Sequence, residues 1–239
     1  MQESTLSNRL QLVASFLPTA ANFADIGSDH AYLPCVVCAR DPQAQAIAGE
    51  INEGPFQNAR KTVEYYNLTH QIQVRKGDGL AVIAADEVNQ ITISGMGGTL
   101  ITQILEHGKS KLGKANRIIT QPNVDAISVR KWFDQNHYNL VIESILEEDG
   151  HIYEVLVADK NEQSSPYKED DKQKQLLFGP HLLKQRTAPF FAKWKIEQEK
   201  RQLALSQMKK ATMPDQDKIA HFESEISMIQ EVLDDDSAR

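Results

Sequence analysis

The 239-residue sequence predicts a Rossmann-like α/β domain followed by a small C-terminal helical domain. Strand-like and helix-like segments alternate from residue 22 to residue 137, which predicts a mostly parallel sheet covered by helices. Two β-rich runs with a very short spacer follow, which predicts that the last strand is antiparallel. Long helical patterns occupy the remainder. We therefore expect one domain at residues 1–160 and a second at residues 161–239.

The first domain begins with an amphipathic helix. Residues 6–17 place leucine and valine side chains on one helical face, and Pro18 ends the pattern. The strands that we expect next are 22–27, 45–51, 72–76, 90–95 and 117–121. The helices expected between and after them are 31–40, 53–67, 97–107 and 125–137.

The end of this domain distinguishes between two fold families. Residues 140–146 and 152–158 are β-rich, and the spacer between them contains Asp149-Gly150, a sequence typical of a hairpin turn. Nicotinamide-binding domains continue instead with parallel βα units. Class I methyltransferases insert their last strand antiparallel, so the hairpin favours that arrangement.

The C-terminal region predicts a linker and a helical hairpin. Residues 160–171 are polar and are expected to be the linker. Two long helical patterns follow, one at 188–210 and one that carries apolar residues at 3-4-3-4 spacing from Ile219 to Leu233. The sequence Met213-Pro214-Asp215 separates them, so the two helices should form an antiparallel, coiled-coil-like pair.

The net charge of −7 is unevenly distributed along the chain. Residues 172–211 contain ten Lys and Arg against two Glu, whereas residues 212–236 contain one Lys against eight acids. A basic segment can bind a polyanion even in an acidic protein, because binding follows the local field. The alternative is that the basic helix pairs with the acidic one. Both interpretations remain open at this stage.

Composition excludes several classes of protein. Hydrophobic residues make up 41% of the chain, which is enough for a folded core. The sequence contains neither an apolar stretch long enough to span a membrane nor a secretory signal, so we expect a cytoplasmic protein without membrane association. Cys35 and Cys38 lie on one expected helix without a second pair or a histidine cluster, so we expect packing residues and no metal site.

The first strand ends in Asp25-Ile26-Gly27, at the sheet edge where α/β proteins bind ligands. Gly27 allows close backbone approach, and the next helix offers free N–H groups. Asp29 stands where a dinucleotide fingerprint has its second glycine, and its carboxylate would repel a diphosphate. A sulfonium cofactor, S-adenosylmethionine, carries positive charge without phosphate and is therefore favoured over NAD. A turn that binds nothing is the remaining alternative.

The other strand ends carry further candidate binding groups. Glu50 ends the second strand, where an acid accepts hydrogen bonds from ribose hydroxyls. Asp78 lies between two glycines and either accepts from an adenine amino group or caps a turn. The glycine-rich end of the fourth strand predicts close approach to a ligand. The expected cofactor-binding residues are Asp25, Gly27, Ser28, Asp29, His30, Glu50, Asp78, Gly79, Gly95, Met96 and Gly97.

Several of these motifs resemble one bacterial family, the tRNA (adenine-N1)-methyltransferases that act on adenosine at tRNA position 22. The resemblance covers essentially the whole chain and is most specific over residues 6–155. The matching runs are Ala24-Asp25-Ile26-Gly27-Ser28-Asp29-His30-Ala31-Tyr32-Leu33-Pro34, Gly49-Glu50, Gly77-Asp78-Gly79, Gly95-Met96-Gly97-Gly98 and Gln121-Pro122-Asn123. The resemblance implies a class I methyltransferase domain that uses S-adenosylmethionine, a coiled-coil-like C-terminal domain and a tRNA substrate.

The chemistry of that reaction suggests roles for individual residues. Adenine N1 is already nucleophilic, so the reaction needs positioning more than a strong base. We expect Asp29 to stabilise the cationic product ring or to contact the cofactor, and Asn123 to accept from the N6 amino group. Tyr32 or His30 could stack on the base. The expected substrate-binding residues are Arg9, Tyr32, Gln121, Pro122, Asn123, Lys184, Arg186, Lys193 and Lys195. We expect the five basic residues among them to bind backbone phosphates.

Three other functions remain as alternatives. The same cofactor could serve another RNA, a protein or a small molecule. A NAD-binding oxidoreductase is disfavoured by Asp29 and by the terminal hairpin. A non-catalytic RNA-binding module would keep the fold without methyl transfer. The sequence specifies neither the tRNA species nor the oligomeric state, although a monomer is slightly favoured.

Overall fold

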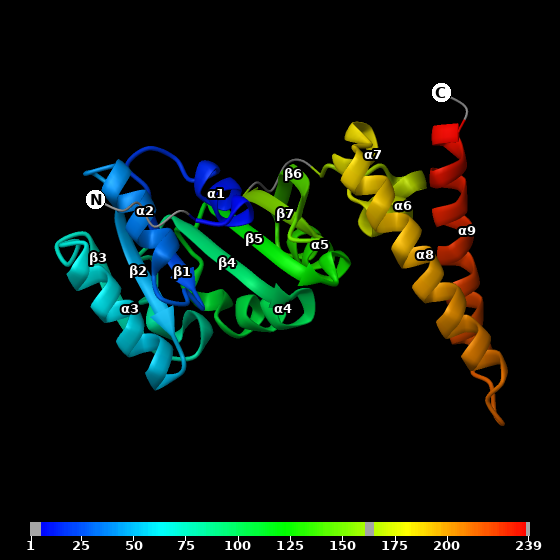
Figure 1. The fold of residues 1–239 in the computed structure, drawn as a ribbon, viewed down its shortest axis with the longest axis horizontal. Helices are drawn as coiled ribbons and strands as arrows, with labels where there is room; N and C mark the ends of the chain where they lie inside the picture. The colour runs from blue at the N-terminus through cyan, green and yellow to red at the C-terminus, as the bar shows by residue number, and fades with distance from the viewer. Residues whose placement is uncertain (1–5, 161–164, 238–239) are drawn as a thin grey trace. The chain divides into compact units, whose positions relative to one another are not determined.

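In the computed structural model, residues 6–160 and 165–237 are described, and the chain divides into two compact units. The first unit runs from Met1 to His181 and contains the sheet, and the second runs from Leu182 to Arg239 and is helical (Figure 1). The predicted N-terminal residues 1–5 and linker residues 161–164 lie outside the described part of the chain.

The sheet has seven strands in the order β3-β2-β1-β4-β5-β7-β6. The first five of these run parallel, and β7 is antiparallel to both of its neighbours. This arrangement confirms the predicted fold class. The strands are β1 (Asn22–Ile26), β2 (Gln45–Glu50), β3 (Ile72–Lys76), β4 (Gln90–Gly97), β5 (Arg117–Val124), β6 (Tyr138–Glu148) and β7 (His151–Lys160).

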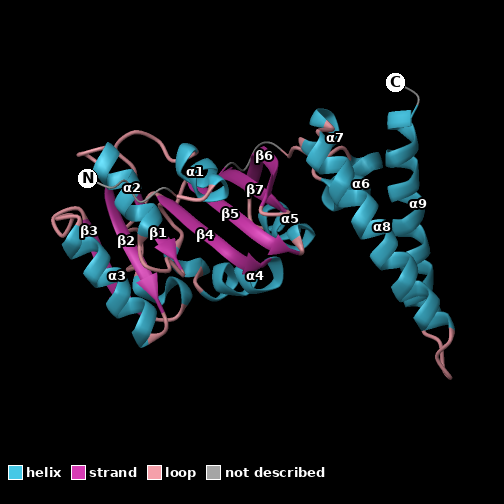
Figure 2. Cartoon of the chain, viewed as in Figure 1, coloured by secondary structure: helices cyan, strands magenta, loops and turns pink. Residues whose placement is uncertain are grey.

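Helices cover both faces of this sheet, because strand residues alternate between two apolar cores (Figure 2). Phe23 of β1 packs in the core under α1 (Asn8–Ser15), α2 (Tyr32–Arg40) and α3 (Glu53–Tyr65). Its neighbour Ala24 packs in the core under α4 (Gly98–His107) and α5 (Ala126–Gln135). The short 3₁₀ turns are η1 (Gly79–Val82), η2 (Lys109–Lys111) and η3 (Glu169–Asp171).

Strands β4 and β5 extend further than predicted. The expected ends were residues 95 and 121, but pairing continues to Gly97 and Val124 across a register shift. Pro122, which has no N–H to donate, lies opposite Met96 at this irregularity, where such a residue is tolerated. The glycine-rich segment and the end of β5 are therefore paired with each other rather than being independent loops.

The first unit does not end at residue 160 as predicted. Tyr167, from the expected linker, packs against the core, and α6 (Lys172–Phe178) follows. Arg130, fully buried on α5, donates from Nη1 to the Leu177 carbonyl at 3.1 Å and from Nε to Glu143 at 2.6 Å. The His181 N–H donates to the same Glu143 carboxylate. These buried contacts hold residues 167–181 on the sheet domain, so the boundary falls after His181.

The second unit contains α7 (Leu182–Gln185), α8 (Ala188–Lys209) and α9 (Gln216–Ser237). Helices α8 and α9 form the predicted antiparallel hairpin, with Ile219, Ile229 and Val232 buried along α9. Ion pairs link the basic helix to the acidic one, at 2.9 Å for Arg201 with Glu225 and 2.6 Å for Lys209 with Glu223. Part of the basic charge is therefore used within the hairpin.

Candidate active site

The carboxyl ends of the parallel strands bring the predicted site residues to one edge of the sheet. Ile26 of β1 lies between Gly49 of β2 and Ile93 of β4 in the strand register. On the other side of β4, Gly97 pairs with Val124 of β5. The turn after β1, the acid that ends β2, the glycines of β4 and the polar end of β5 are therefore neighbours.

The turn after β1 has an unusual backbone. Gly27 has φ +69°, and the non-glycine residues Asp29, His30 and Ala31 follow with φ +37°, +49° and +57°. Side chains disfavour this left-handed region, and such strain concentrates at functional sites. The turn is held from β2, because the Gly27 N–H donates to the Gly49 carbonyl at 3.0 Å and the Asp29 N–H donates to Glu50 Oε1. The Asp29 carboxylate itself is 79% exposed.

Asp25 lies beneath this turn and is nearly inaccessible to solvent. Its carboxylate accepts hydrogen bonds from the Ser28 hydroxyl at 2.6 Å and the Thr92 hydroxyl at 2.7 Å. Burial raises the pKa of Asp25, and the two hydroxyls oppose that shift. Both carboxylate oxygens are thus engaged by the protein. Asp25 and Ser28, expected to contact the cofactor, are joined to each other and fix the turn from below.

Two further carboxylates lie at this edge of the sheet: Glu50 at the end of β2, beside the turn, and Asp78 after β3. Burial raises the pKa of Glu50, the Asp29 N–H opposes this shift, and the nearby Asp29 and Asp25 charges add to it. One Glu50 oxygen accepts from Asp29, and the other has no hydrogen-bond partner among the described residues. Asp78 is exposed directly after β3. The edge therefore offers acceptors to ligand hydroxyl or amino groups, in a negative field that suits a cation.

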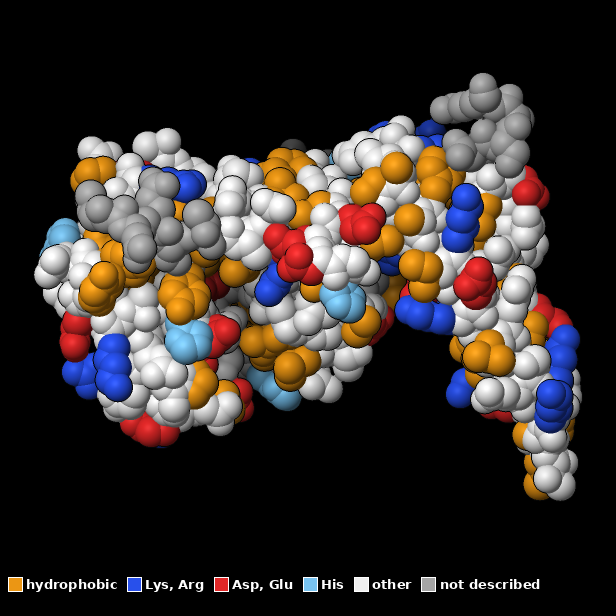
Figure 3. Space-filling view, in the orientation of Figure 1, with side chains coloured by type: hydrophobic (Ala, Val, Ile, Leu, Met, Phe, Trp, Pro, Cys, Tyr) orange, Lys and Arg blue, Asp and Glu red, His pale blue; other side chains and the backbone are white. Residues whose placement is uncertain are grey.

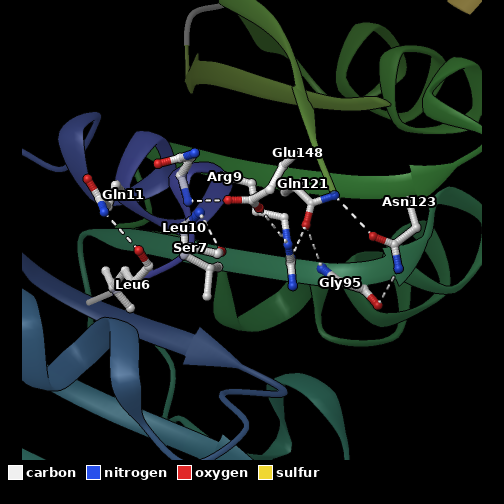
Figure 4. A network of polar contacts seen from close by, with 10 residues as sticks. Leu6, Ser7, Arg9, Leu10, Gln11, Gly95, Gln121, Asn123 and Glu148 are labelled. Carbon is white, nitrogen blue, oxygen red and sulfur yellow. Dashed lines mark hydrogen bonds and ion pairs between the residues drawn. The ribbon is translucent and has the colours of Figure 1, made fainter. Parts of the chain in front are cut away.

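The end of β5 carries a chain of hydrogen bonds that reaches across the edge (Figure 4). Gln121 Oε1 accepts from the Gly95 N–H at 3.1 Å, and Gln121 Nε2 donates to Asn123 Oδ1 at 3.1 Å. Asn123 Nδ2 donates back to the Gly95 carbonyl at 2.8 Å. Gln121 is fully buried, whereas Asn123 is exposed. Of the two amides, Asn123 is the one that a substrate can reach.

Arg9 joins this chain from α1. Its Nη1 donates to Gln121 Oε1 at 2.6 Å, its Nε lies 3.8 Å from Glu148, and its guanidinium stands 5.2 Å from the centre of the Tyr153 ring. We expected Arg9 to bind phosphate, but its guanidinium is engaged within the protein. Glu148 and Tyr153 were not predicted as site residues. They carry no local signal, because only the hairpin of β6 and β7 brings them to α1.

Aromatic and apolar side chains line the same edge. His30 stacks on Tyr32 with ring centres 5.3 Å apart, and His30 Nε2 lies 3.4 Å from Asp29. Tyr32 is 40% exposed. Three large apolar side chains that we did not predict are also exposed: Ile51 just after β2, Leu100 in the first turn of α4 and Val124 at the end of β5. Flat ligands such as purines bind between surfaces of this kind.

The glycines at this edge differ in how much free space lies beside their backbone. A Cβ at Gly95, where φ is +77°, would meet only the Arg9 guanidinium at 3.9 Å, so the space beside this backbone is open. A Cβ at Gly27 would lie 2.2 Å from Met96 Cε, so Met96 lies directly on the Gly27 turn. Open backbone beside acidic acceptors fits a nucleoside cofactor without phosphate. Gly79, at φ +50°, forms the tight turn that presents Asp78.

The predicted basic residues of the second unit differ in their surroundings. Arg186 pairs with Asp235 at 3.2 Å, and Lys193 stands 5.2 Å from the centre of the Trp194 ring. Lys184 and Lys195 are exposed, and neither forms an ion pair within the described ranges. Figure 3 shows basic and acidic side chains together on this unit. Lys184 and Lys195 are the two whose charge remains available.

Other sequence expectations concern redox, metal and membrane chemistry. Burial raises the pKa of Cys35 and of Cys38 to about 12, so both are protonated, inert packing residues at neutral pH. Across residues 6–160 and 165–237, no group of His, Cys, Asp and Glu is arranged to hold a metal ion. Within the same residues, helices of the length and apolarity that a bilayer crossing requires are absent.

Comparison with known proteins identifies the family of the chain. A family profile described as tRNA (adenine(22)-N(1))-methyltransferase matches residues 23–231. The chain belongs to this family. The tRNA (adenine(22)-N(1))-methyltransferase of Bacillus subtilis is 44% identical over 98% of this chain and 99% of its own length.

Solved structures extend the similarity to the fold. The crystal structure of the Bacillus subtilis m1A22 tRNA methyltransferase has a TM-score of 0.89 at 43% identity, covering 96% of this chain and 99% of that one. A putative tRNA (m1A22) methyltransferase from Streptococcus pneumoniae, solved in complex with S-adenosyl-L-methionine, has a TM-score of 0.83 at 41% identity, covering 96% and 100%. The adenine(22)-N(1)-methyltransferase family thus shares both units of this chain.

Proposed function

We propose that this protein transfers a methyl group from S-adenosylmethionine to N1 of the adenosine at position 22 of tRNA. The observation that carries the proposal is the shared sheet edge. There, in a member of the adenine(22)-N(1)-methyltransferase family, an acidic turn without the dinucleotide glycine fingerprint follows β1, and the Asn123 amide lies at the end of β5, with β4 between them. The B. subtilis relative is named for this reaction.

The acidic side of the edge would hold the cofactor. S-adenosylmethionine, when bound, supplies an electrophilic methyl group on a positively charged sulfonium. Glu50 has a carboxylate oxygen left for ribose hydroxyls, and Asp78 is placed to accept from an adenine amino group. The open backbone at Gly95 allows the close approach that such a ligand needs, whereas Met96 covers the Gly27 turn.

The amide side of the edge would hold the target base. Asn123 Oδ1 accepts one hydrogen bond within the protein and can accept a second from the adenine N6 amino group. The N1 lone pair then remains free to attack, and the exposed Asp29 carboxylate stabilises the positive charge that develops on the ring. Tyr32, stacked on His30, offers an aromatic surface for a base that has left its helix.

The rest of the substrate would be held by positive charge. Lys184 and Lys195 are exposed and carry charge that the helical hairpin does not neutralise, so they suit backbone phosphates. Arg186 and Lys193, which already have partners, would contribute less. The proposal includes a cytoplasmic location, which agrees with a tRNA substrate.

The decisive experiment is nucleoside mass spectrometry of unmodified tRNA incubated with the protein and methyl-labelled cofactor. We expect labelled 1-methyladenosine from a transcript with adenosine at position 22 and none from the same transcript with guanosine there. Asp29→Asn should lower kcat by about tenfold or more while cofactor binding is kept. Absence of 1-methyladenosine from the first transcript, or equal label from both, contradicts the proposed function.

A further inference from the structure

The hydrogen bonds that converge on Asn123 have only one possible direction. An arginine guanidinium and a backbone N–H are donors without acceptor capacity. Both Arg9 Nη1 and the Gly95 N–H point at the same Gln121 atom, which must therefore be the carbonyl oxygen. This fixes the orientation of the Gln121 amide without reference to any ligand.

The orientation of Gln121 then dictates that of Asn123. Because the Gln121 oxygen faces Arg9, its NH₂ group faces Asn123. The Asn123 oxygen must therefore be the atom that accepts the hydrogen bond. The opposite end of the Asn123 amide donates to the Gly95 carbonyl, a group that can only accept. Two separate contacts thus impose the same polarity on the exposed amide, and one of them originates at Arg9.

This polarity matters because the two ends of an amide are opposite in hydrogen-bonding sense. An oxygen accepts from the N6 amino group of adenine and leaves N1 unblocked. A reversed amide would present N–H groups, which repel the N6 amino group and can occupy the N1 lone pair that must attack. The same reversal would favour a purine that carries an acceptor at position 6.

The Arg9 side chain is held in place by contacts other than its bond to Gln121, so it can orient the Gln121 amide. Its side chain is 26% exposed, and it is fixed on two further sides by Glu148 and by the face of Tyr153. Glu148 also accepts from the Asn8 N–H at the start of α1. The guanidinium therefore cannot turn toward a phosphate without losing its contacts with β5, β6 and β7, which include the hydrogen bond to Gln121.

We propose that Arg9 and Gln121 are positioning residues that fix the polarity of the Asn123 amide, so that the Asn123 oxygen selects adenine through its N6 amino group. The proposal rests on the proposed function and adds to it a determinant of base choice. It also connects α1 to the reacting base through two amides, those of Gln121 and Asn123.

The test is a coupling measurement between these residues and the N6 amino group. Two tRNAs are compared, one with adenosine and one with purine riboside at position 22, which lacks the amino group but keeps the N1 lone pair. For the native protein we expect kcat/KM to be about ten- to a hundredfold lower with purine riboside, because the Asn123 oxygen then has no amino group from which to accept. The different basicity of N1 in the two bases cancels when variants are compared.

Variants should change this ratio. Gln121→Glu replaces the NH₂ group that donates to the Asn123 oxygen with a carboxylate oxygen that repels it, while the Gly95 carbonyl still favours the native polarity. The Asn123 amide should then reverse in part of the molecules, and the ratio should fall by about three- to tenfold. Arg9→Met removes one of two donors to Gln121 and should give an intermediate ratio. Arg9→Lys keeps a donor and should restore most of it. Cofactor affinity, measured by calorimetry, should be unchanged in all three.

Arg117→Met is the matched control. Arg117 is 28% exposed, and it pairs with Asp159 and donates to the Phe16 carbonyl beyond the far end of α1. Its loss disturbs the seating of α1 without touching the amides, so the ratio should stay at the native value even where activity falls.

The outcomes separate the two proposals. A native protein that does not methylate the adenosine transcript contradicts the proposed function. A native protein that methylates it, but whose purine riboside ratio is near one or is retained in Gln121→Glu and Arg9→Met, overturns the inference alone.

Discussion

Asp25 is a residue at which the needs of the site oppose those of stability. Its carboxylate is buried to hold the turn at Gly27, and burial raises its pKa above the ordinary value of 3.8. Above pH 3.8 the native state therefore binds more protons at this group than the unfolded state does. Its contribution to stability is present at low pH and is lost as the pH rises through the native pKa.

We therefore predict the effect of Asp25→Asn, which keeps the shape and can still bond to both hydroxyls. The stability of this variant relative to the native protein should increase between pH 4 and pH 8, because the variant has no carboxylate to ionise. Urea unfolding at several pH values measures this difference. A difference that is constant with pH, or that falls as pH rises, contradicts the assignment.

Glu87 should contribute to stability with the opposite pH dependence, because its pKa is lowered in the native state. Hydrogen bonds from Arg75 and from the Ala84 N–H lower the pKa of Glu87 to about 2. Its contribution is present above the unfolded value of 4.5 and is lost as the pH falls toward about 2. Glu87→Gln should destabilise the protein most at neutral pH, with the loss shrinking below pH 4.5. A loss that grows on acidification contradicts this pairing.

The residues of the site were predictable to the extent that they lie at strand ends. Asp29, Glu50 and Asn123 follow buried runs, and parallel strands place such ends together. The partners of Arg9 were not predictable, because Gln121 is 112 positions away and only the folded sheet brings the two together. Asp25 was expected to bind the cofactor, and its burial beneath the turn depends on Thr92 of the adjacent strand.

At the scale of elements, close backbone approach between α4 and the β5–α5 connection shapes the edge. A Cβ on Gly98, the first residue of α4, would lie 1.9 Å from the Asp125 carbonyl oxygen. That oxygen is backbone and follows the end of β5 on which Asn123 lies. The position of α4 and that of the base-binding strand end are therefore coupled through one glycine.

Gly98→Ala should therefore destabilise the protein by about 1–3 kcal/mol and lower methyl transfer, because the β5 end must move to admit the methyl group. Gly54→Ala is the matched control, since Gly54 lies in the first turn of α3 with no atom within 4 Å of the added Cβ. That change should be neutral or stabilise by up to about 1 kcal/mol. Thermal unfolding and turnover of both variants measure this, and equal effects contradict the coupling.

The elements themselves followed from sequence better than their limits. The sequence predicted the position of each described strand, most clearly for β1 and β2, because burial on both faces leaves apolar runs there. The extensions of β4 and β5 depend on pairing across a register shift between Met96 and its neighbours, which local pattern does not report. The β6–β7 hairpin is also longer than expected, because its pairing continues from Tyr138 to Glu148 on β6, beyond the β-rich runs seen in the sequence.

At the scale of the whole molecule, the acidic chain has to bind a polyanion through a few local charges. Exchange of Lys184 and Lys195 for alanine should raise the Kd for tRNA and reduce the slope of log Kd against log salt by about 0.7–0.9 for each phosphate that is no longer neutralised. Cofactor affinity should not change. Lys209→Ala is the control, because Lys209 pairs with Glu223 in the hairpin. An unchanged salt slope in the double variant excludes these lysines from the interface.

The boundary between the two units lies after His181, so the sheet domain should need residues 167–181 in order to fold. Residues 167–181 supply Leu177 and Phe178 to the core and carbonyl acceptors to buried Arg130. Glu143 would remain as a partner of Arg130 in the shorter chain, but loss of the carbonyl acceptors leaves buried donors unpaired at a cost of about 1–3 kcal/mol, and the missing apolar burial adds to it. A chain of residues 1–181 should therefore unfold cooperatively and bind S-adenosylmethionine, whereas residues 1–160 should be unfolded or bind far more weakly. Circular dichroism melts and calorimetry of both chains decide this, and equal melting temperatures and affinities would show that the segment is a linker after all.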